Sequence, residues 1–178
     1  REILQMVALM PMAIPGIVLG LAYIFFFNAK DNPLNFIYAT MAILVINTVV
    51  HFYTVSHLSA VTAVKKLDQE FESVSLSLKV PIYKMFFKIT LPVCLPTVFD
   101  IFIYLFCNAM TTVSGVIFLY SYDTTLASVS AIHLDEQGDV AGAAAMAMLI
   151  VYISFVVRGL HTLVSTLLLK RTQAWRNI

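Results

Sequence analysis

The chain has 178 residues, of which 60% are hydrophobic and 12% charged, and its mean hydropathy is +0.88. Soluble domains are roughly 45–50% apolar and about 25% charged, so this composition excludes a soluble globule and indicates an all-α integral membrane protein. A formal net charge of +1 gives no sign of a nucleic-acid partner, because the placement of charges matters more than their sum.

The beginning of the chain and its two cysteines set two expectations. Arg1 begins abruptly, with no initiator Met, so we expect an N-terminally truncated fragment whose earlier segments are missing. The apolar run that follows is too long for a signal peptide. Cys94 and Cys107 lie in one apolar run, where a helix would separate them by about 20 Å. That separation exceeds disulfide reach, and we expect free thiols.

Residues 3–29 contain no charged residue and are predicted to form the first membrane span, because about 20 apolar helical residues cross a bilayer core. Pro11 and Pro15 predict a kink, which a helix bundle tolerates. Gly16 and Gly20 have the GxxxG spacing that lets another helix approach closely. Helix packing is the main interpretation of these residues, and a kink that lines a pore is the alternative.

A polar turn is predicted at residues 28–33, and the second span at about residues 35–55. Asn47, His51 and Thr54 recur at helical spacing and share one face. The first interpretation is that they form hydrogen bonds between helices. The second is that they line a polar pathway through the membrane.

A polar, helix-prone segment follows at about residues 65–92, and a third apolar run extends over residues 96–122. Asp100 interrupts that run and is expected near the water interface. A polar cluster close to the midpoint of the run supplies further candidates for the lining of a pathway: Asn108, Thr111, Thr112 and Ser114.

Residues 123–138 are too few to cross a membrane, and they predict a short amphipathic helix on the membrane surface, followed by a turn at Gly138. The acidic residues and the histidine of this loop fit no ligand pattern, so a solvated loop is favoured over a metal site. These residues are His133, Asp135, Glu136 and Asp139. The last span is predicted to start near Val140, to reach the far interface at Arg158 and to continue to about Leu169.

Four spans result, and the distribution of basic residues orients them. The segment 65–92 and the C-terminal tail are predicted to face the cytoplasm, and the loop at residues 123–139 to face outward. The basic residues of the cytoplasmic side are Lys65, Lys66, Lys79, Lys84, Lys88, Lys170, Arg171 and Arg176, whereas the opposite side has only Lys30. Trp175 in the tail is expected to be an interfacial anchor.

The segment EFESVSLSLKVPIYKMFFKITLP, residues 70–92, resembles the cytoplasmic EAA loop of ABC-importer permeases, the binding-protein-dependent transport subunits. Its ending, Ile89 to Pro92, matches the I-x-L-P of that loop, and Ser77-Leu78 stands where the family often has Ser-Leu. The chain departs from the motif at two places. The family glycine falls on Lys79, and E-A-A falls on Ser73-Val74-Ser75.

Further resemblances extend over essentially the whole chain. PMAIPGIVLGLAYIF, residues 11–25, is similar to the proline-glycine span that these permeases carry two helices before the loop. The order of spans resembles the C-terminal four helices of a six-helix type-I importer transmembrane domain, which residues 1–178 would represent. HFYTVSHLSAVTAVKKLDQEFESVS, TTVSGVIFLYSYDTTLASVSAI and KRTQAW are similar to permeases assigned to 2-aminoethylphosphonate uptake, a group close to the ferric-iron permeases.

The resemblance implies a permease subunit of an ATP-driven importer in the bacterial inner membrane. The solute would be 2-aminoethylphosphonate or a related phosphonate, with ferric iron or another small solute as the alternative. The implied partners are cytoplasmic ABC ATPase subunits, a second permease domain (identical, different or fused), a periplasmic substrate-binding protein and membrane lipid.

No cofactor or metal is expected on this chain. The phosphate-binding pattern GxxxxGKS/T is absent from the sequence, so ATP and Mg would bind to the partner ATPase. The rival from another class is an intramembrane enzyme that uses His51, His57 or Asp100. The six-residue spacing of the two histidines places them on different helical faces, which disfavours a catalytic pair. No triad or paired-carboxylate arrangement is evident.

In such importers the loop forms a coupling helix, expected here at about residues 72–79, that docks in a cleft of the ATPase. Pro81 is predicted to stop this helix, and Pro92 and Pro96 to redirect the chain into the third span. An ordinary amphipathic helix lying on lipid is the alternative. The residues assigned to coupling are Glu70, Phe71, Glu72, Ser73, Val74, Ser75, Leu76, Ser77, Leu78, Lys79, Leu91 and Pro92, of which Phe71, Val74, Leu76 and Leu78 would enter a partner groove.

Overall fold

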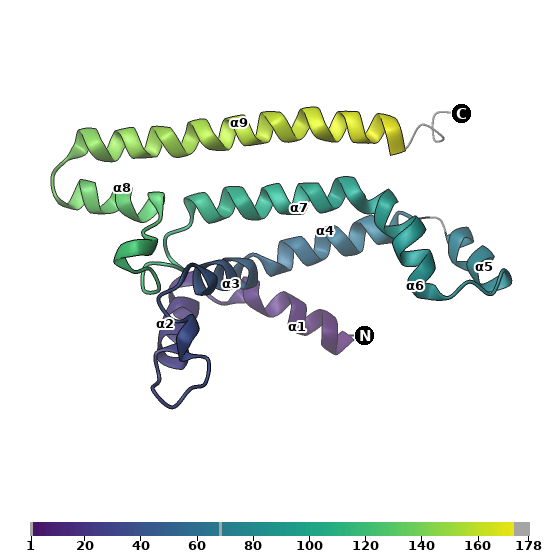
Figure 1. Cartoon of the computed structure of the whole chain (residues 1–178), viewed down its shortest axis with the longest axis horizontal. Helices are drawn as coiled ribbons and strands as arrows, with labels where there is room; N and C mark the ends of the chain where they lie inside the picture. Colours follow the sequence, from purple (N-terminus) through teal and green to yellow (C-terminus); the bar gives the residue numbers. More distant parts are fainter. Residues whose placement is uncertain (1, 68, 173–178) are drawn as a thin grey trace. The chain divides into compact units, whose positions relative to one another are not determined.

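The computed structural model describes residues 2–67 and 69–172, and of residues 69–72 and 167–172 it describes the backbone alone. This part of the chain consists of helices and turns without a strand (Figure 1), which confirms the predicted all-α class. The α-helices are α1 (Glu2–Ala13), α2 (Gly16–Phe27), α3 (Met41–His51), α4 (Tyr53–Lys65), α5 (Gln69–Ser77), α6 (Ile82–Met85), α7 (Leu91–Thr111), α8 (Ala127–Glu136) and α9 (Val140–Thr172). Two 3-10 turns, η1 (Asn35–Ile37) and η3 (Tyr122–Thr124), and one π-helical turn, η2 (Phe86–Thr90), complete the order.

The chain divides into two compact units. The first unit runs up to Thr54 and continues over Leu105–Val156. The second unit comprises Val55–Tyr104 and the chain from Val157 onward. Helices α4, α7 and α9 contribute residues to both units.

Two helices are long and apolar enough to cross a membrane on their own, Ile82–Thr111 and Val140–Thr166. Two helix pairs meet the same criterion only when their members are taken together. The pair α1 and α2 is bent by 101°, and the pair α3 and α4 by 57°. The described part of the chain therefore holds two to four candidate spans, and it reaches the predicted four if each bent pair is one span.

The first predicted span, residues 3–29, is broken rather than kinked. Pro15 precedes α2 with extended backbone, at φ −58° and ψ 139°. Proline lacks an N–H and disfavours helical backbone in the residue before it. Ile14 and Pro15 therefore separate two helices, and Figure 1 shows α1 and α2 running in clearly different directions.

The second predicted span, residues 35–55, also differs from the observed helices. Its first residues form the turn η1, and α3 begins only at Met41. Phe52 then separates α3 from α4, with its N–H bonded to the carbonyl of Thr48. No proline or glycine marks this bend, which explains why the pattern of residue types did not reveal it.

The third run stays helical only as far as Thr111, not to Tyr122 as predicted. Beyond α7 the backbone forms consecutive turns, in which Val116 N–H bonds to Val113 O and Leu119 N–H to Val116 O. The β-branched residues at positions 111–113 and the glycine at position 115 have low helix propensity. The polar candidates of this run therefore lie at and beyond the end of α7, and their predicted placement near the midpoint of a span was wrong.

At the other end of this run, Pro92 and Pro96 do not interrupt the helix, although α6 and α7 run in different directions (Figure 1). The helical segment Ile82–Thr111 passes through both prolines, and Pro96 is buried inside α7. The turn η2 precedes Pro92, and the N–H of Leu91 bonds there to the carbonyl of Phe86. A π turn is one way for a helix to absorb a local irregularity such as a missing N–H.

The short helix and the turn at Gly138 predicted after the third run are observed, as is the start of the last helix near Val140. Helix α8 ends in a turn at Gly138, whose φ is +83°. Gly138 N–H bonds to Asp135 O and Asp139 N–H to Leu134 O, the pattern of a Schellman cap. Helix α9 then begins at Val140 and runs through Arg158 without a break.

Buried apolar side chains gather in the first unit. Ile43 and Leu44 of α3 pack with Val116, Leu119 and Val129 of the turn segment and α8. Each of these five side chains is at most 2% exposed. In the second unit the buried residues of the described part are Ser75, Thr90 and Pro96, so its large apolar side chains remain at least partly open.

Candidate functional site

A helix is observed where the coupling helix was predicted: α5, Gln69–Ser77, begins three residues earlier than predicted and ends two residues earlier. The side chains of Glu70, Phe71 and Glu72 lie outside the described residues. From Ser73 onward the side chains are described, and they decide which faces of α5 are open.

Helix α5 ends in a left-handed turn at Lys79. Lys79 has a φ of +51°, its N–H bonds to Leu76 O, and the N–H of Val80 bonds to Ser75 O. These two bonds form a Schellman cap, whose left-handed position is usually glycine. The left-handed conformation costs a residue with a side chain about 1 kcal/mol. Lys79 therefore departs from the family motif in residue type, but it keeps the backbone conformation for which glycine is suited.

Three apolar side chains of the α5 region are exposed: Val74 by 55%, Leu76 by 64% and Leu78 by 69%. Val74 and Leu78 are four positions apart and share one face, and the N–H of Leu78 still bonds to Val74 O. Leu76 lies about 200° around the helix from Val74. The apolar residues assigned to one docking surface therefore divide between two faces.

The serines of α5 act within the segment. Ser75 is 8% exposed, and its hydroxyl donates to Val80 O at 3.3 Å. Ser77 donates to Ser73 O at 3.0 Å. Ser75 thus supports the turn at Lys79 and offers little surface to a partner. Leu91 and Pro92, which end the motif, form the first turn of α7.

Two polar residues of the predicted second span bond across the first unit. Asn47 is 1% exposed, and its Nδ2 donates to Gly115 O at 2.9 Å. Thr54 is 2% exposed, and its hydroxyl donates to Ala8 O at 2.9 Å. The bond from Thr54 joins α4 to α1, as the interpretation of hydrogen bonding between helices requires, whereas the bond from Asn47 joins α3 to the turn segment after α7.

The two glycines of α2 allow a close approach, although their neighbour is not a helix. A Cβ on Gly16 would lie 2.6 Å from Ser114 Oγ and 3.3 Å from His51 Cε1. A Cβ on Gly20 would lie 2.7 Å from the carbonyl oxygen of Gly115. The GxxxG spacing therefore serves contact with the turn segment that follows α7.

Three pathway candidates, Asn47, His51 and Ser114, thus meet around Gly16 and Gly115. Two of them carry buried atoms without a hydrogen-bond partner in the described part of the chain, Oδ1 of Asn47 and Nδ1 of His51. Buried polar atoms normally find a partner. These two atoms are therefore candidate hydrogen-bonding groups for a water molecule or a polar solute group.

The other pathway candidates lie on the last turns of α7 and just beyond it. Thr111 is exposed, and its hydroxyl bonds within the helix to Cys107 O at 3.1 Å. The carbonyl of Thr112 accepts a bond from Ser128 Oγ of α8 at 2.8 Å, and Asn108 is half-buried. Sequence reasoning missed Ser128, because a helix expected on the membrane surface gave no sign of a buried hydroxyl.

In α8, His133 Nε2 lies 3.1 Å from the hydroxyl of Tyr120. Tyr120 was also missed, because a tyrosine in an apolar run resembles an ordinary packing residue. Within the described residues, no group of three or more His, Cys, Asp or Glu side chains is arranged to hold a metal ion. Both cysteines are free.

Residues 1–170 match the family model described as "Binding-protein-dependent transport system inner membrane component". The chain is 29% identical over 157 residues to the ferric transport system permease protein FbpB of Actinobacillus pleuropneumoniae, a match that covers 88% of this chain and 22% of the relative. It is 34% identical over 124 residues to the putative ferric transport system permease protein FbpB 1 of Haemophilus influenzae, covering 70% of this chain and 19% of the relative.

A shorter match joins the chain to the putative ferric transport system permease-like protein AfuB of Escherichia coli. The two are 28% identical over 92 residues, which cover 52% of this chain and 77% of the relative. The chain therefore spans about a fifth of the length of the first two relatives.

Proposed function

The chain belongs to the family of binding-protein-dependent transport system inner membrane components, and from that membership we propose that it couples ATP hydrolysis on a partner subunit to solute import through α5. The family consists of transport permeases, and the rival interpretation of an intramembrane enzyme is set aside. The observation that carries the proposal is the exposed apolar face of Val74 and Leu78, next to the left-handed cap at Lys79.

The α5 face has the properties of a docking element. Val74 and Leu78 are more than half exposed, and an amphipathic helix places such residues in the groove of a partner. Burial of apolar surface contributes roughly 25 cal/mol per Å². The cleft of a cytoplasmic ABC ATPase is the proposed groove, and ATP and Mg would bind there.

The backbone after α5 is suited to pass on a displacement. Two hydrogen bonds fix the turn at Lys79. The helical segment Ile82–Thr111 then runs from that turn into a candidate span. A movement of α5 would thus reach the span through the short link at residues 80–81, which is how we propose that the ATPase drives alternating access.

The remaining elements of the importer complete the proposal. The coupling segment and the C-terminus would lie in the cytoplasm, and the loop at residues 123–139 in the periplasm, where a substrate-binding protein would deliver the solute. A second permease domain would face this one across the pathway. The polar cluster of Asn47, His51 and Ser114 supports a pathway contribution from the first unit, because two of its buried atoms have no hydrogen-bond partner in the described part of the chain.

Two solutes are proposed. The stretches similar to 2-aminoethylphosphonate permeases favour a phosphonate. Ferric iron is supported at least as well, because three relatives are named as ferric transport permeases or permease-like proteins. Members of one fold family often differ in their ligands, so a direct uptake measurement decides between them.

The test uses the full complex of permease, ATPase and matching binding protein in liposomes. ATP hydrolysis and solute uptake are measured with 2-aminoethylphosphonate and with ferric iron, in separate arms. Val74→Asp is expected to reduce solute-stimulated hydrolysis and uptake about tenfold or more, because a charge replaces a central apolar contact. Leu76→Asp, on the other face of α5, is the matched control.

The outcomes separate the parts of the proposal. Uptake at the wild-type rate by an assembled Val74→Asp complex would show that this face does not couple. Loss of uptake in Leu76→Asp alone would move the docking surface to the opposite face. Stimulation by only one of the two solutes identifies the cargo, and stimulation by neither removes both solute proposals but leaves the coupling result standing.

A further inference from the structure

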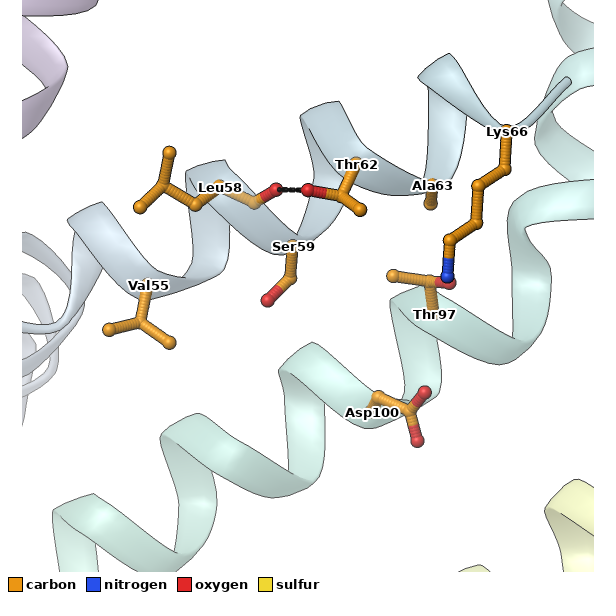
Figure 2. A pocket seen from close by; sticks show the side chains of 8 residues that line it. All are labelled: Val55, Leu58, Ser59, Thr62, Ala63, Lys66, Thr97 and Asp100. Atoms are coloured by element: carbon orange, nitrogen blue, oxygen red, sulfur yellow. Dashed lines mark hydrogen bonds between the residues drawn. The ribbon is translucent and has the colours of Figure 1, made fainter.

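A groove lies between α4 and α7 within the second unit (Figure 2). Its volume is about 420 Å³, within the range of small-molecule sites. Helix α4 and the residue after it contribute Val55, Leu58, Ser59, Thr62, Ala63 and Lys66, and α7 contributes Thr97 and Asp100. The spacing of the α4 positions by three, one, three, one and three residues places all of them on one helical face.

The lining changes from apolar to charged along the groove. Val55 and Leu58 stand at one end, Ser59 and Thr62 in the middle, and Lys66 at the other end. From Val55 to Lys66 the helix rises by about 16 Å. This order suits an amphiphilic ligand, whose polar group would lie near Lys66 and whose hydrocarbon would lie along Val55 and Leu58.

The charged end of the groove carries both signs, from Lys66 and Asp100. Lys66 reaches from the end of α4 toward the side of the groove where Thr97 lies (Figure 2). Asp100 follows Thr97 by about one helical turn, and no ion pair joins it to Lys66. Its Oδ1 is 3.1 Å from His161 Nε2 of α9. That contact lacks hydrogen-bond geometry, so the buried His161 Nε2 has no hydrogen-bond partner in the described part.

A ligand that matches this end has an anionic group for Lys66 and a cationic group for Asp100, close together. The hydroxyls of Ser59, Thr62 and Thr97 add polar contacts. Thr62 already donates to Leu58 O at 2.7 Å, so its oxygen can only accept there, from an ammonium for example. A phosphoryl group joined to a primary ammonium by two carbons has this arrangement of charges.

We propose that the groove binds the headgroup of an ethanolamine phospholipid, with the phosphate at Lys66 and the ammonium at Asp100. Free zwitterions of the same chemistry, such as phosphoethanolamine, share the charged contacts. The apolar end at Val55 and Leu58 favours the lipid, because a free zwitterion would leave that end unfilled. The inference requires that the chain lies in a phospholipid bilayer and is independent of the transported solute.

The test uses the full transporter complex reconstituted in nanodiscs that contain a photoactivatable phospholipid. Phosphatidylethanolamine is compared with phosphatidylcholine and phosphatidylglycerol that carry the same photolabel, and labelled peptides are mapped by mass spectrometry. Labelling of the α4 and α7 peptides is expected to be about threefold to tenfold stronger with the ethanolamine lipid. A primary ammonium donates charge-assisted hydrogen bonds to a carboxylate, whereas a quaternary ammonium cannot.

Three variants assign the contacts. Asp100→Asn is expected to remove the preference for ethanolamine over choline, and Lys66→Gln to reduce labelling by all three lipids. Lys65→Gln changes the neighbouring lysine, which does not line the groove, and is expected to leave labelling unchanged. His161→Gln breaks the contact with Asp100 but retains the carboxylate. A preserved ethanolamine preference in that variant shows that Asp100 acts on the lipid directly.

Several outcomes would overturn the proposal. Equal labelling by ethanolamine and choline lipids in the wild type is the first. An unchanged ethanolamine preference in Asp100→Asn is the second. The third is a preference that His161→Gln loses to the same extent as Asp100→Asn. Competition with soluble phosphoethanolamine and 2-aminoethylphosphonate separates the sources. Displacement of the lipid by either compound at low millimolar concentration assigns the groove to a free zwitterion, and no displacement supports the lipid.

Discussion

The first unit contains a small buried apolar core, whereas the second unit buries almost none of its described side chains. Ile43, Leu44 and Val116 of the first unit are at most 2% exposed, and hydrogen bonds from Asn47 and Thr54 join distant segments around them. In the described part of the second unit, burial is limited to Ser75, Thr90 and Pro96. The exposed face of α5 and the groove beside α4 both belong to this second unit.

This difference indicates a division of roles between stability and contact. An apolar surface that a chain does not bury is available to lipid or to another protein. The first unit should therefore respond to substitution mainly through the free energy of unfolding. Substitutions in the second unit should mainly change the coupling of ATP hydrolysis to transport, the contact with lipid and the assembly of the complex. Four predictions test this contrast, from the largest expected effect to the smallest.

Gly20→Ala should destabilise the first unit most strongly. Its Cβ would lie 2.7 Å from the backbone carbonyl of Gly115, an atom that cannot move aside as a side chain can. We expect a loss of about 2–3 kcal/mol, the upper part of the range for overpacking. The measurement is the thermal unfolding midpoint of the purified complex in detergent.

The matched control is Gly159→Ala in α9, where a Cβ would meet no atom within 4 Å. It should be neutral, or stabilising by up to about 1 kcal/mol through helix propensity. Equal midpoints for the two variants would contradict the close approach of α2 to the turn segment.

Thr54→Val should cost about 1 kcal/mol, the measured scale of hydrogen bonds between membrane helices. The substitution preserves shape but leaves the carbonyl of Ala8 without its donor. Thr62→Val is the control, because that exposed hydroxyl bonds to Leu58 O of its own helix. Denaturant titration of both variants should separate them, and an equal loss in each would show that the bond from Thr54 contributes nothing specific.

Lys79→Gly should stabilise the second unit locally, by about 0.5 kcal/mol. Glycine removes the left-handed strain at φ +51°, although it also gains entropy in the unfolded chain, which offsets part of the effect. Hydrogen exchange at the amides of residues 79 and 80 should slow, whereas Lys84→Gly inside α6 should accelerate exchange nearby. Faster exchange in Lys79→Gly would argue against the observed cap.

Val74→Asp should have the smallest effect on unfolding, within about 0.5 kcal/mol, because the side chain is 55% exposed. The same variant is expected to lose transport almost completely. A thermal midpoint that falls as far as that of Gly20→Ala would mean that Val74 is packed within the chain, and the contrast between the units would fail.

Several features of this protein follow from the sequence alone, because they depend on local chemistry. The density of apolar residues indicates membrane helices, whichever segments those residues pack against. The turn at Gly138 and the break near Pro15 follow from the backbone preferences of single residues. The position of the polar segment follows from its charge, and the left-handed residue at Lys79 stands where the family motif has glycine.

Other features depend on which distant segments meet, and the tertiary structure alone decides them. Phe52 separates α3 from α4 without a local signal, and α7 ends at Thr111 although the apolar run continues. Gly16 and Gly20 contact the turn segment at Ser114 and Gly115 rather than a helix. The groove between α4 and α7 exists only because Lys66 and Asp100, far apart in sequence, come to line one cavity. Residue types set local backbone preference and polarity, but such contacts depend on the packing of the whole unit, which no local pattern encodes.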